Sequence, residues 1–96
     1  MSEYIIRIRL EKAKDEDYLR LVESMKDHGY LAVIKDKEGN QYIMPLGNFR
    51  VESGQDKNEI LDHVNLIVSA LWKKKYQILV TGAAERANTW IGLKGI

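Results

Sequence analysis

The order in which hydrophobic periods follow one another predicts the architecture of this chain. Residues 4–10 alternate between apolar and other positions, which is typical of a strand with one buried face. Residues 15–28 instead carry apolar side chains at the spacing of an amphipathic helix, with acidic residues in the first turn and Gly29 as a predicted C-terminal cap. The first third of the chain therefore predicts a strand followed by a helix.

Two shorter strands follow this helix. Residues 30–35 are β-prone, and residues 40–44 return after a tight turn, which predicts an antiparallel hairpin. Pro45 and Gly47 then interrupt the pattern. Because proline has no N–H to donate to a ladder, we expect a bulge or a break before pairing resumes at residues 48–51.

The second half of the chain repeats the helix and the strand. Residues 56–59 have the spacing of a capping box, and a broad apolar stripe over residues 60–71 then predicts a helix. Lysines at 73–75 close it, residues 76–81 form the last long predicted strand, and residues 89–93 contain a short β-like run.

The complete order, β-α-β-β-α-β, predicts an α+β fold of the ferredoxin-like kind. Right-handed crossovers would give a two-layer sandwich, with an antiparallel sheet in the order 4-1-3-2, both helices on one face and an extra short C-terminal strand. A chain of 96 residues suffices for one two-layer domain but not for two. We therefore expect a single domain over residues 1–96, with a core at 3–82 and a C-terminal extension at 83–96.

Composition excludes several classes of protein. The chain has no cysteine, which rules out disulfides, thiolate catalysis and cysteine-ligated metal centres, and we predict no metal site and no cofactor. No apolar run approaches the ~20 residues that cross a bilayer, and Met1 leads into the first strand without a basic and apolar leader, so we expect a cytoplasmic protein without membrane contact. The net charge of +1 means that nucleic-acid binding would need a local cluster of basic side chains.

Strand phase predicts such a cluster. If the apolar positions of the first and third strands face the helices, the arginines between them project from the other face of two neighbouring central strands: Arg7, Arg9 and Arg50. Each guanidinium presents a planar fork of donors suited to phosphate oxygens. The open face is therefore a candidate surface for single-stranded RNA.

An alternative explanation of the three arginines remains open. They are also consistent with ordinary solvated positions that pair with Glu3, Glu11 or Glu52, or with positions buried in a dimer interface. Ile5 and Leu79 on the same predicted face favour a contact surface of some kind, because apolar residues among arginines are unusual on a fully wet face.

The two histidines are the side chains whose ordinary pKa suits acid–base chemistry near neutrality. His28 is a candidate catalytic residue; the alternative is that it is only a positively charged residue at the C-terminal end of the helix, where the helix dipole favours a cation. His63 is expected to be a partly packed helical residue. The run Lys73, Lys74 and Lys75 is a second candidate patch for phosphate contact. The alternative is that these lysines form an ordinary solvated helix end.

Several functions that this fold supports lack their motifs here. Residues 47–51 do not match the aromatic string of an RNA-recognition module, and residues 11–15 lack the glycine and arginine of an acylphosphatase-like phosphate loop. The end of the first strand carries Leu10 and Glu11 where related CRISPR-associated nucleases usually have an aspartate, and no loop for a small-molecule regulatory ligand is evident.

The pattern resembles that of the GhoS family, the endoribonuclease antitoxins of type V toxin–antitoxin systems. The resemblance covers about residues 4–82 and is carried by residues 4–6, the leucine- and methionine-rich first helix, residues 32–36 with Gly39, then Leu46, Phe49 and residues 59–64. It implies a ferredoxin-like fold and sequence-selective cleavage of the messenger RNA of a small membrane-active toxin. It carries over no catalytic residue.

Two hypotheses follow. In the first, the protein is an RNA-binding endoribonuclease in which Arg7, Arg9 and Arg50 hold phosphates and a histidine or arginine assists attack by the ribose 2′-hydroxyl without a metal. In the second, it is a non-catalytic interaction module that forms a homodimer through the open face or through an edge strand near Trp90.

Overall fold

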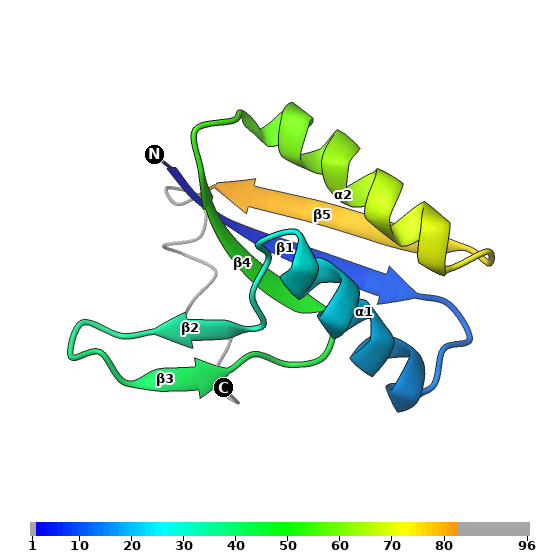
Figure 1. The fold of residues 1–96 in the computed structure, drawn as a ribbon, viewed down its shortest axis with the longest axis horizontal. Coiled ribbons are helices and arrows are strands. Elements are labelled where there is room, and N and C mark those ends of the chain that lie inside the picture. The colour runs from blue at the N-terminus through cyan, green and yellow to red at the C-terminus, as the bar shows by residue number, and fades with distance from the viewer. Residues whose placement is uncertain (1, 83–96) are drawn as a thin grey trace.

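A computed structural model describes residues 2–82 of the chain. Helices α1 (Asp15–Asp27) and α2 (Lys57–Leu71) pack on a sheet, and a separate two-stranded ribbon lies beside it (Figure 1). The sheet contains β1 (Ser2–Leu10), β4 (Asn48–Ser53) and β5 (Tyr76–Gly82), and the ribbon contains β2 (Val33–Lys35) and β3 (Gln41–Ile43). The predicted strand at 89–93, with Trp90, lies outside the described residues.

The sheet is antiparallel, with β1 between β4 and β5. This confirms the predicted α+β class and the central place of the first strand. The pairing of β2 with β3 confirms the predicted hairpin, but the hairpin forms a separate sheet and does not continue the ladder beside β4 as the order 4-1-3-2 requires. Among residues 2–82, Leu31 alone pairs with the edge of β4 that faces away from β1, through reciprocal backbone hydrogen bonds of 2.9 and 2.7 Å with Arg50. The chain leaves that edge at once to form the ribbon, so the order 4-1-3-2 is not completed by a ladder.

The end of α1 determines where the chain goes next. Gly29 has a φ of 90° and donates to the carbonyl of Lys26 at 3.0 Å, while Tyr30 donates to the carbonyl of Met25 at 2.9 Å. These two bonds form a Schellman motif, which needs a left-handed residue at the position of Gly29. The motif confirms the predicted cap and turns Tyr30 into the core, where it is 3% exposed.

The start of α2 is the predicted capping box. The Asp56 carboxylate accepts from the backbone N–H of Glu59 at 2.9 Å, and the Glu59 carboxylate accepts from the backbone N–H of Asp56 at 3.1 Å. The acceptors satisfy backbone donors that have no partner within the helix. The helix therefore begins where the sequence predicted.

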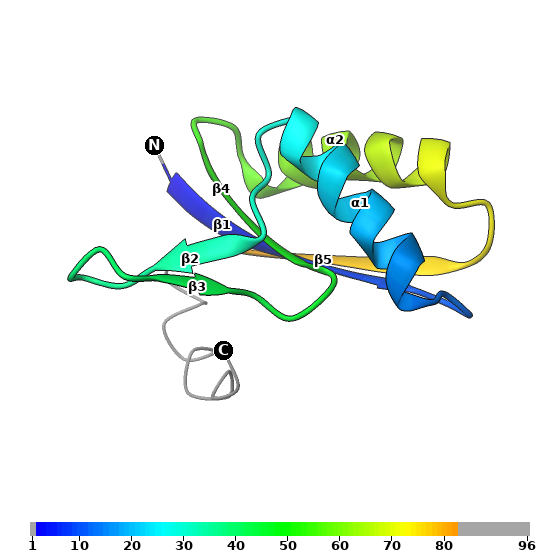
Figure 2. The same cartoon turned by 60° about the horizontal axis from the view of Figure 1, so that its bottom comes forward.

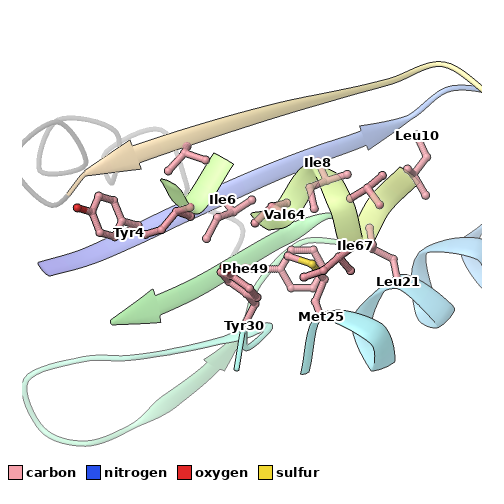
Figure 3. Close-up of a cluster of buried hydrophobic side chains, with 13 residues drawn as sticks. Tyr4, Ile6, Ile8, Leu10, Leu21, Met25, Tyr30, Phe49, Val64 and Ile67 are labelled. Carbon is pink, nitrogen blue, oxygen red and sulfur yellow. The ribbon is translucent and has the colours of Figure 1, made fainter. Parts of the chain in front are cut away.

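The main core lies between the helices and one face of the sheet (Figure 3). Its largest fully buried side chains include Ile6 and Phe49 from neighbouring strands, Leu21 from α1, and Val64 and Val68 from α2. Ile6 and Phe49 are cross-strand partners, so their side chains lie on the same face of the sheet. The alternation predicted for residues 4–10 is confirmed on this face.

The ribbon builds a second, smaller core on the opposite face of the sheet. Ile5 of β1 is 3% exposed because Ile34 and Met44 pack against it. Figure 2 shows the helices on one side of the sheet, with the ribbon directed away from them. The contact surface that Ile5 indicated in the sequence is therefore filled, at this position, by the chain's own ribbon.

Pro45 and Gly47 form a turn that leads into β4. Asn48 donates its backbone N–H to the carbonyl of Pro45 at 3.1 Å, and Gly47 has a φ of 88°. A Cβ at Gly47 would lie 2.4 Å from the carbonyl oxygen of Ile8, so only glycine fits there. Of the two predicted possibilities, the break is what the structure contains.

Candidate nucleic-acid interface

The strand register places the three predicted arginines on the sheet face opposite the helices. In β1, Arg7 pairs with Asn48 of β4 and with Leu79 of β5, and Ile5 pairs with Arg50 of β4. Directly opposed residues of antiparallel strands share a face, and so do alternate residues of one strand. This surface, which we call the open face, therefore carries Arg7, Arg9 and Arg50.

Arg50 is occupied by carboxylates. Its guanidinium is ion-paired with Glu3 through Nε and with Glu52 through an Nη2 to Oε1 contact of 2.7 Å. Glu3 and Glu52 are themselves cross-strand partners, so Arg50 lies where two negative charges would otherwise meet. The alternative of glutamate pairing thus describes Arg50, and its charge is largely neutralised within the protein.

Arg7 and Arg9 are in a different state. Both side chains are exposed, and neither has a hydrogen-bond or ion-pair partner anywhere in residues 2–82. Alternate residues of an antiparallel strand lie about 6.8 Å apart along its axis. Within residues 2–82, the structure therefore places two guanidinium groups without a partner in a row on the central strand, with their donors available for an anion.

An open hollow of about 450 Å³ lies beside these two arginines. Leu79 is 55% exposed and Leu46 is 46% exposed, so the hollow combines cations, amide groups and apolar surface. It runs from the turn before β4 across β1 to β5 and includes Arg7, Arg9, Leu46, Asn48, Gln77 and Leu79 among its lining residues.

The edge of β1 next to Arg9 is completed by a helix side chain. Strand β4 begins at Asn48, opposite Arg7, and leaves the last residues of β1 without a strand on that side. The Tyr18 hydroxyl of α1 accepts from the backbone N–H of Leu10 at 2.9 Å and donates to the carbonyl of Leu10 at 3.3 Å. Tyr18 also lines the hollow. Helical spacing accounts for Tyr18 as an apolar position of α1 but gives no signal of its contact with Leu10.

Two of the three predicted lysines are engaged locally. Lys73 donates from Nζ to the carbonyl of Ser69 at 2.8 Å, which satisfies a carbonyl at the end of α2. The Nζ of Lys74 lies 5.5 Å from the ring centroid of Trp72, within the range of a cation–π contact. These contacts agree with the helix-end interpretation for Lys73, while both cations remain exposed to solvent.

Lys75 lies nearer to the arginines than the other two lysines do. Its carbonyl accepts from the backbone N–H of Glu11 at 3.0 Å, which joins the end of β1 to the start of β5. A second hollow of about 470 Å³ at this place is lined by Glu11, Lys12, Lys74 and Lys75. The cations therefore continue from Arg9 around the end of the central strand, and Lys12 is a member that the sequence did not single out.

The histidines lie on the other side of the sheet. His28 follows α1 and His63 belongs to α2, and their ring centroids are 5.5 Å apart. The Tyr30 hydroxyl lies 2.8 Å from Nδ1 of His63. The structure thus joins two histidines that looked unrelated in the sequence, but it does not bring His28 to the arginines of the open face.

The Asp-x-x-Gly turn of the ribbon is built around one carboxylate. Asp36 accepts from the backbone N–H groups of Glu38 and Asn40, each at 2.9 Å, and from the hydroxyl of Tyr42 at 3.0 Å. Burial acts to raise the pKa of Asp36, but the hydrogen bonds from Tyr42 and Asn40 outweigh it and hold the pKa below its ordinary value. Asp36 therefore has a structural role.

Within residues 2–82, no three or more histidine, aspartate or glutamate side chains gather in a way that would hold a metal ion. None of the helices in the same part of the chain is long and apolar enough to span a membrane.

Comparison with known proteins gives one match. The sequence model of a family described as Endoribonuclease GhoS matches residues 1–88 of the chain. The search of curated proteins found no match. The matched range covers every described element of the fold and extends beyond the end of β5, so it is longer than the resemblance that the sequence alone suggested.

Proposed function

Because the chain belongs to the GhoS endoribonuclease family, we propose that it is an RNA-cleaving antitoxin that binds single-stranded RNA on its open face. The main observation in favour of this site is that Arg7 and Arg9 have no partner within residues 2–82 and lie beside a hollow of about 450 Å³, which is larger than one phosphate group. The messenger RNA of a small membrane-active toxin is the proposed substrate, as the family resemblance implies.

The arrangement suits an extended single strand. Arg7 and Arg9 are spaced like successive phosphates of a stretched backbone, and Arg can bind each phosphate through two donors. The amide side chains of Asn48 and Gln77 flank them, and exposed Leu79 offers apolar surface to a base. Lys12 and Lys75 extend the cationic path past the end of β1.

The proposed reaction is attack of a ribose 2′-hydroxyl on the adjacent phosphorus. The 2′-hydroxyl gives up its proton to water as its oxygen bonds to phosphorus, the bond to the 5′-oxygen breaks, and the 5′-oxygen takes up a proton from water, so that the products are a 2′,3′-cyclic phosphate and a 5′-hydroxyl. Guanidinium groups that already face the phosphate stabilise the charge that develops on its oxygens. We assign this role to Arg7 and Arg9; the predicted role of His28 would require RNA that reaches the helical layer.

We also infer that the fold is a variant of the ferredoxin-like sandwich. The support is the pairing of Leu31 with Arg50 at the free edge of β4, which is the place of the second strand in the order 4-1-3-2. In this chain the segment leaves the edge early and forms the ribbon.

Cleavage is tested with the purified full chain, a mixed RNA pool and EDTA. We expect fragments with 2′,3′-cyclic phosphate ends from the wild-type protein, and strongly reduced cleavage by the variant Arg7→Ser/Arg9→Ser. Arg20→Ser is the matched control, because Arg20 is an exposed arginine of α1 that pairs with Asp17. Intact RNA, together with no mobility shift at low salt, would contradict the proposed function.

Binding is tested separately, by measuring the RNA dissociation constant at several salt concentrations. Loss of two phosphate contacts in Arg7→Ser/Arg9→Ser should weaken binding roughly tenfold or more and reduce the slope of log affinity against log salt by about 1.4. Arg20→Ser should keep the wild-type slope. A double variant with an unchanged slope would show that phosphates bind elsewhere.

A second candidate function is the non-catalytic homodimer. It is favoured by Leu79 on the open face and by Ile43 of the ribbon, which are 55% and 80% exposed. Sedimentation of the full chain separates the two functions. A tight dimer that protects Arg7 and Arg9 from a guanidinium-modifying reagent would favour the interaction module, and a monomer with both arginines reactive would favour RNA binding.

A further inference from the structure

Two imidazoles and a tyrosine hydroxyl meet between α1 and α2. The rings of His28 and His63 approach edge to face, with an angle of 75° between their planes and 5.5 Å between their centroids. These are the only histidines of a chain that has no cysteine. The proposed RNA site does not use them, because it lies on the other face of the sheet.

In both histidines, the ring nitrogen that contacts an oxygen is Nδ1. Nδ1 of His28 lies 2.9 Å from the carbonyl oxygen of Ser24, and since a carbonyl only accepts, this nitrogen carries the proton. Nδ1 of His63 lies 2.8 Å from the hydroxyl of Tyr30, and which of the two donates depends on the tautomer of the ring. Neither Nε2 has a hydrogen-bond partner in the described part of the chain. When His63 also carries its proton on Nδ1, both Nε2 lone pairs are available.

In histidines that ligate metals, one nitrogen binds the ion and the other commonly donates to an oxygen that fixes the ring, and the Nδ1 contacts of His28 and His63 leave Nε2 for this use. We propose that His28 and His63 chelate one divalent late transition-metal ion, of the zinc, copper or nickel class, through their Nε2 atoms. Imidazole nitrogen favours these ions over magnesium and calcium, which take oxygen ligands.

The spacing of the rings fits one shared ion. With metal–nitrogen bonds of about 2.0–2.1 Å and a tetrahedral angle, the centroids of two imidazoles on one ion lie roughly 5 Å apart. The observed 5.5 Å is close to this value. The remaining coordination positions belong to water, since no third histidine or carboxylate completes a cluster within residues 2–82.

The residue that orients His63 and His63 itself come from different parts of the fold. Tyr30, which orients His63, is 3% exposed and is fixed by the turn that ends α1, while His63 itself belongs to α2. An ion held by both imidazoles would therefore link the end of α1 to α2. Because it binds the folded chain and not the separated histidines of the unfolded chain, it should raise the unfolding temperature.

The test uses the untagged full chain and ZnCl₂ as the probe. Calorimetry should give saturable binding of one zinc per chain, and the ¹H–¹⁵N spectra of the imidazoles should show coordination at Nε2 of both rings. His28→Gln and His63→Gln should each lose at least about tenfold in affinity, and Tyr30→Phe should lose less. Tyr76→Phe is the matched control, because its hydroxyl bonds to Asn65 at 2.6 Å and does not touch either histidine.

Several outcomes would contradict a metal site shared by His28 and His63. No saturable zinc binding, equal binding of MgCl₂, or coordination through Nδ1 would each contradict it. If only one of the two histidine variants loses affinity, a single imidazole holds the ion and the shared site is wrong. The amide spectra of all variants are compared with that of the wild-type chain, so that loss of fold is separated from loss of a ligand.

Discussion

The open face of the sheet has two halves that differ in what the chain places on them. In the half under the ribbon, Ile5 is buried by Ile34 and Met44, and Arg50 is paired with carboxylates. In the other half, which we call the bare half, Arg7 and Arg9 have no partner among the described residues and border a hollow.

The difference teaches that strand alternation decides which face a side chain takes, and that a neighbouring segment decides its environment. Arg7 and Arg50 share a face by register, yet only Arg50 meets glutamates. The ribbon turns an apolar position of the open face into a small core. The bare half keeps a positive charge that residues 2–82 do not neutralise, and this is why we propose RNA binding there.

The largest expected difference between the halves is in stability. Ile5→Ala should lower the free energy of unfolding by about 2–4 kcal/mol, because it leaves a cavity between the sheet and the ribbon. Leu79→Ala removes a similar side chain from the bare half, where it is 55% exposed, and should change the free energy of unfolding by no more than about 0.5 kcal/mol. Urea unfolding of both variants measures this, and equal losses would remove the distinction between the halves.

A smaller effect is expected at the paired arginine. Arg50→Ser leaves Glu3 opposite Glu52 without the cation between them, and should cost about 1 kcal/mol of unfolding free energy at neutral pH. Adding Glu52→Gln should restore part of that loss, since one of the two like charges is then gone. Arg7→Ser should leave the free energy of unfolding unchanged. A loss for Arg7→Ser as large as that for Arg50→Ser would show that Arg7 is not free.

The smallest effect is expected at the turn of the ribbon and depends on pH. The pKa of Asp36 is depressed in the folded chain, so its contribution to stability is present above its ordinary value of 3.8 and is lost as the pH falls through the lower folded value. Asp36→Asn should therefore flatten the fall in stability between about pH 5 and pH 2. Urea midpoints over this range measure it.

A second variant sharpens that prediction. Tyr42→Phe removes a hydroxyl that donates to Asp36, so the carboxylate has one stabilising hydrogen bond less. The fall in stability at low pH, which we call the acid limb, should therefore move to higher pH. An acid limb that is the same in Asp36→Asn, Tyr42→Phe and wild type would show that other carboxylates govern the pH dependence.

The sequence predicted the elements with strong local signals. The capping box at Asp56, the helix end at Gly29 and the alternation through Ile6 and Ile8 are confirmed, because each depends on residues that are neighbours in the chain. The break at Gly47 was one of two predicted geometries, and what decides it is the close approach of the Ile8 carbonyl, a contact distant in sequence.

The parts that escaped prediction depend on long-range packing. Alternation predicted the shared face of the arginines, but not that Arg50 would be neutralised while Arg7 stays free, because the positions of the glutamates are set by register. The approach of His28 to His63 follows from the packing of α1 against α2, and two histidines on separate helices leave no periodic signal. The hairpin itself was predicted and is confirmed by the pairing of β2 with β3. Its departure from the edge of β4 was not predicted, because it accompanies the packing of Ile34 and Met44 against Ile5, which is distant in sequence.

The most direct test of the central claim maps bound RNA on the protein. The ¹⁵N-labelled full chain is titrated with a single-stranded oligonucleotide whose 2′-hydroxyls are methylated, so that it binds without being cleaved. We predict that the largest changes in amide chemical shift lie in the bare half, at Arg7, Arg9, Asn48 and Gln77. Changes confined to the ribbon half or to the helical layer around His28 would contradict the account.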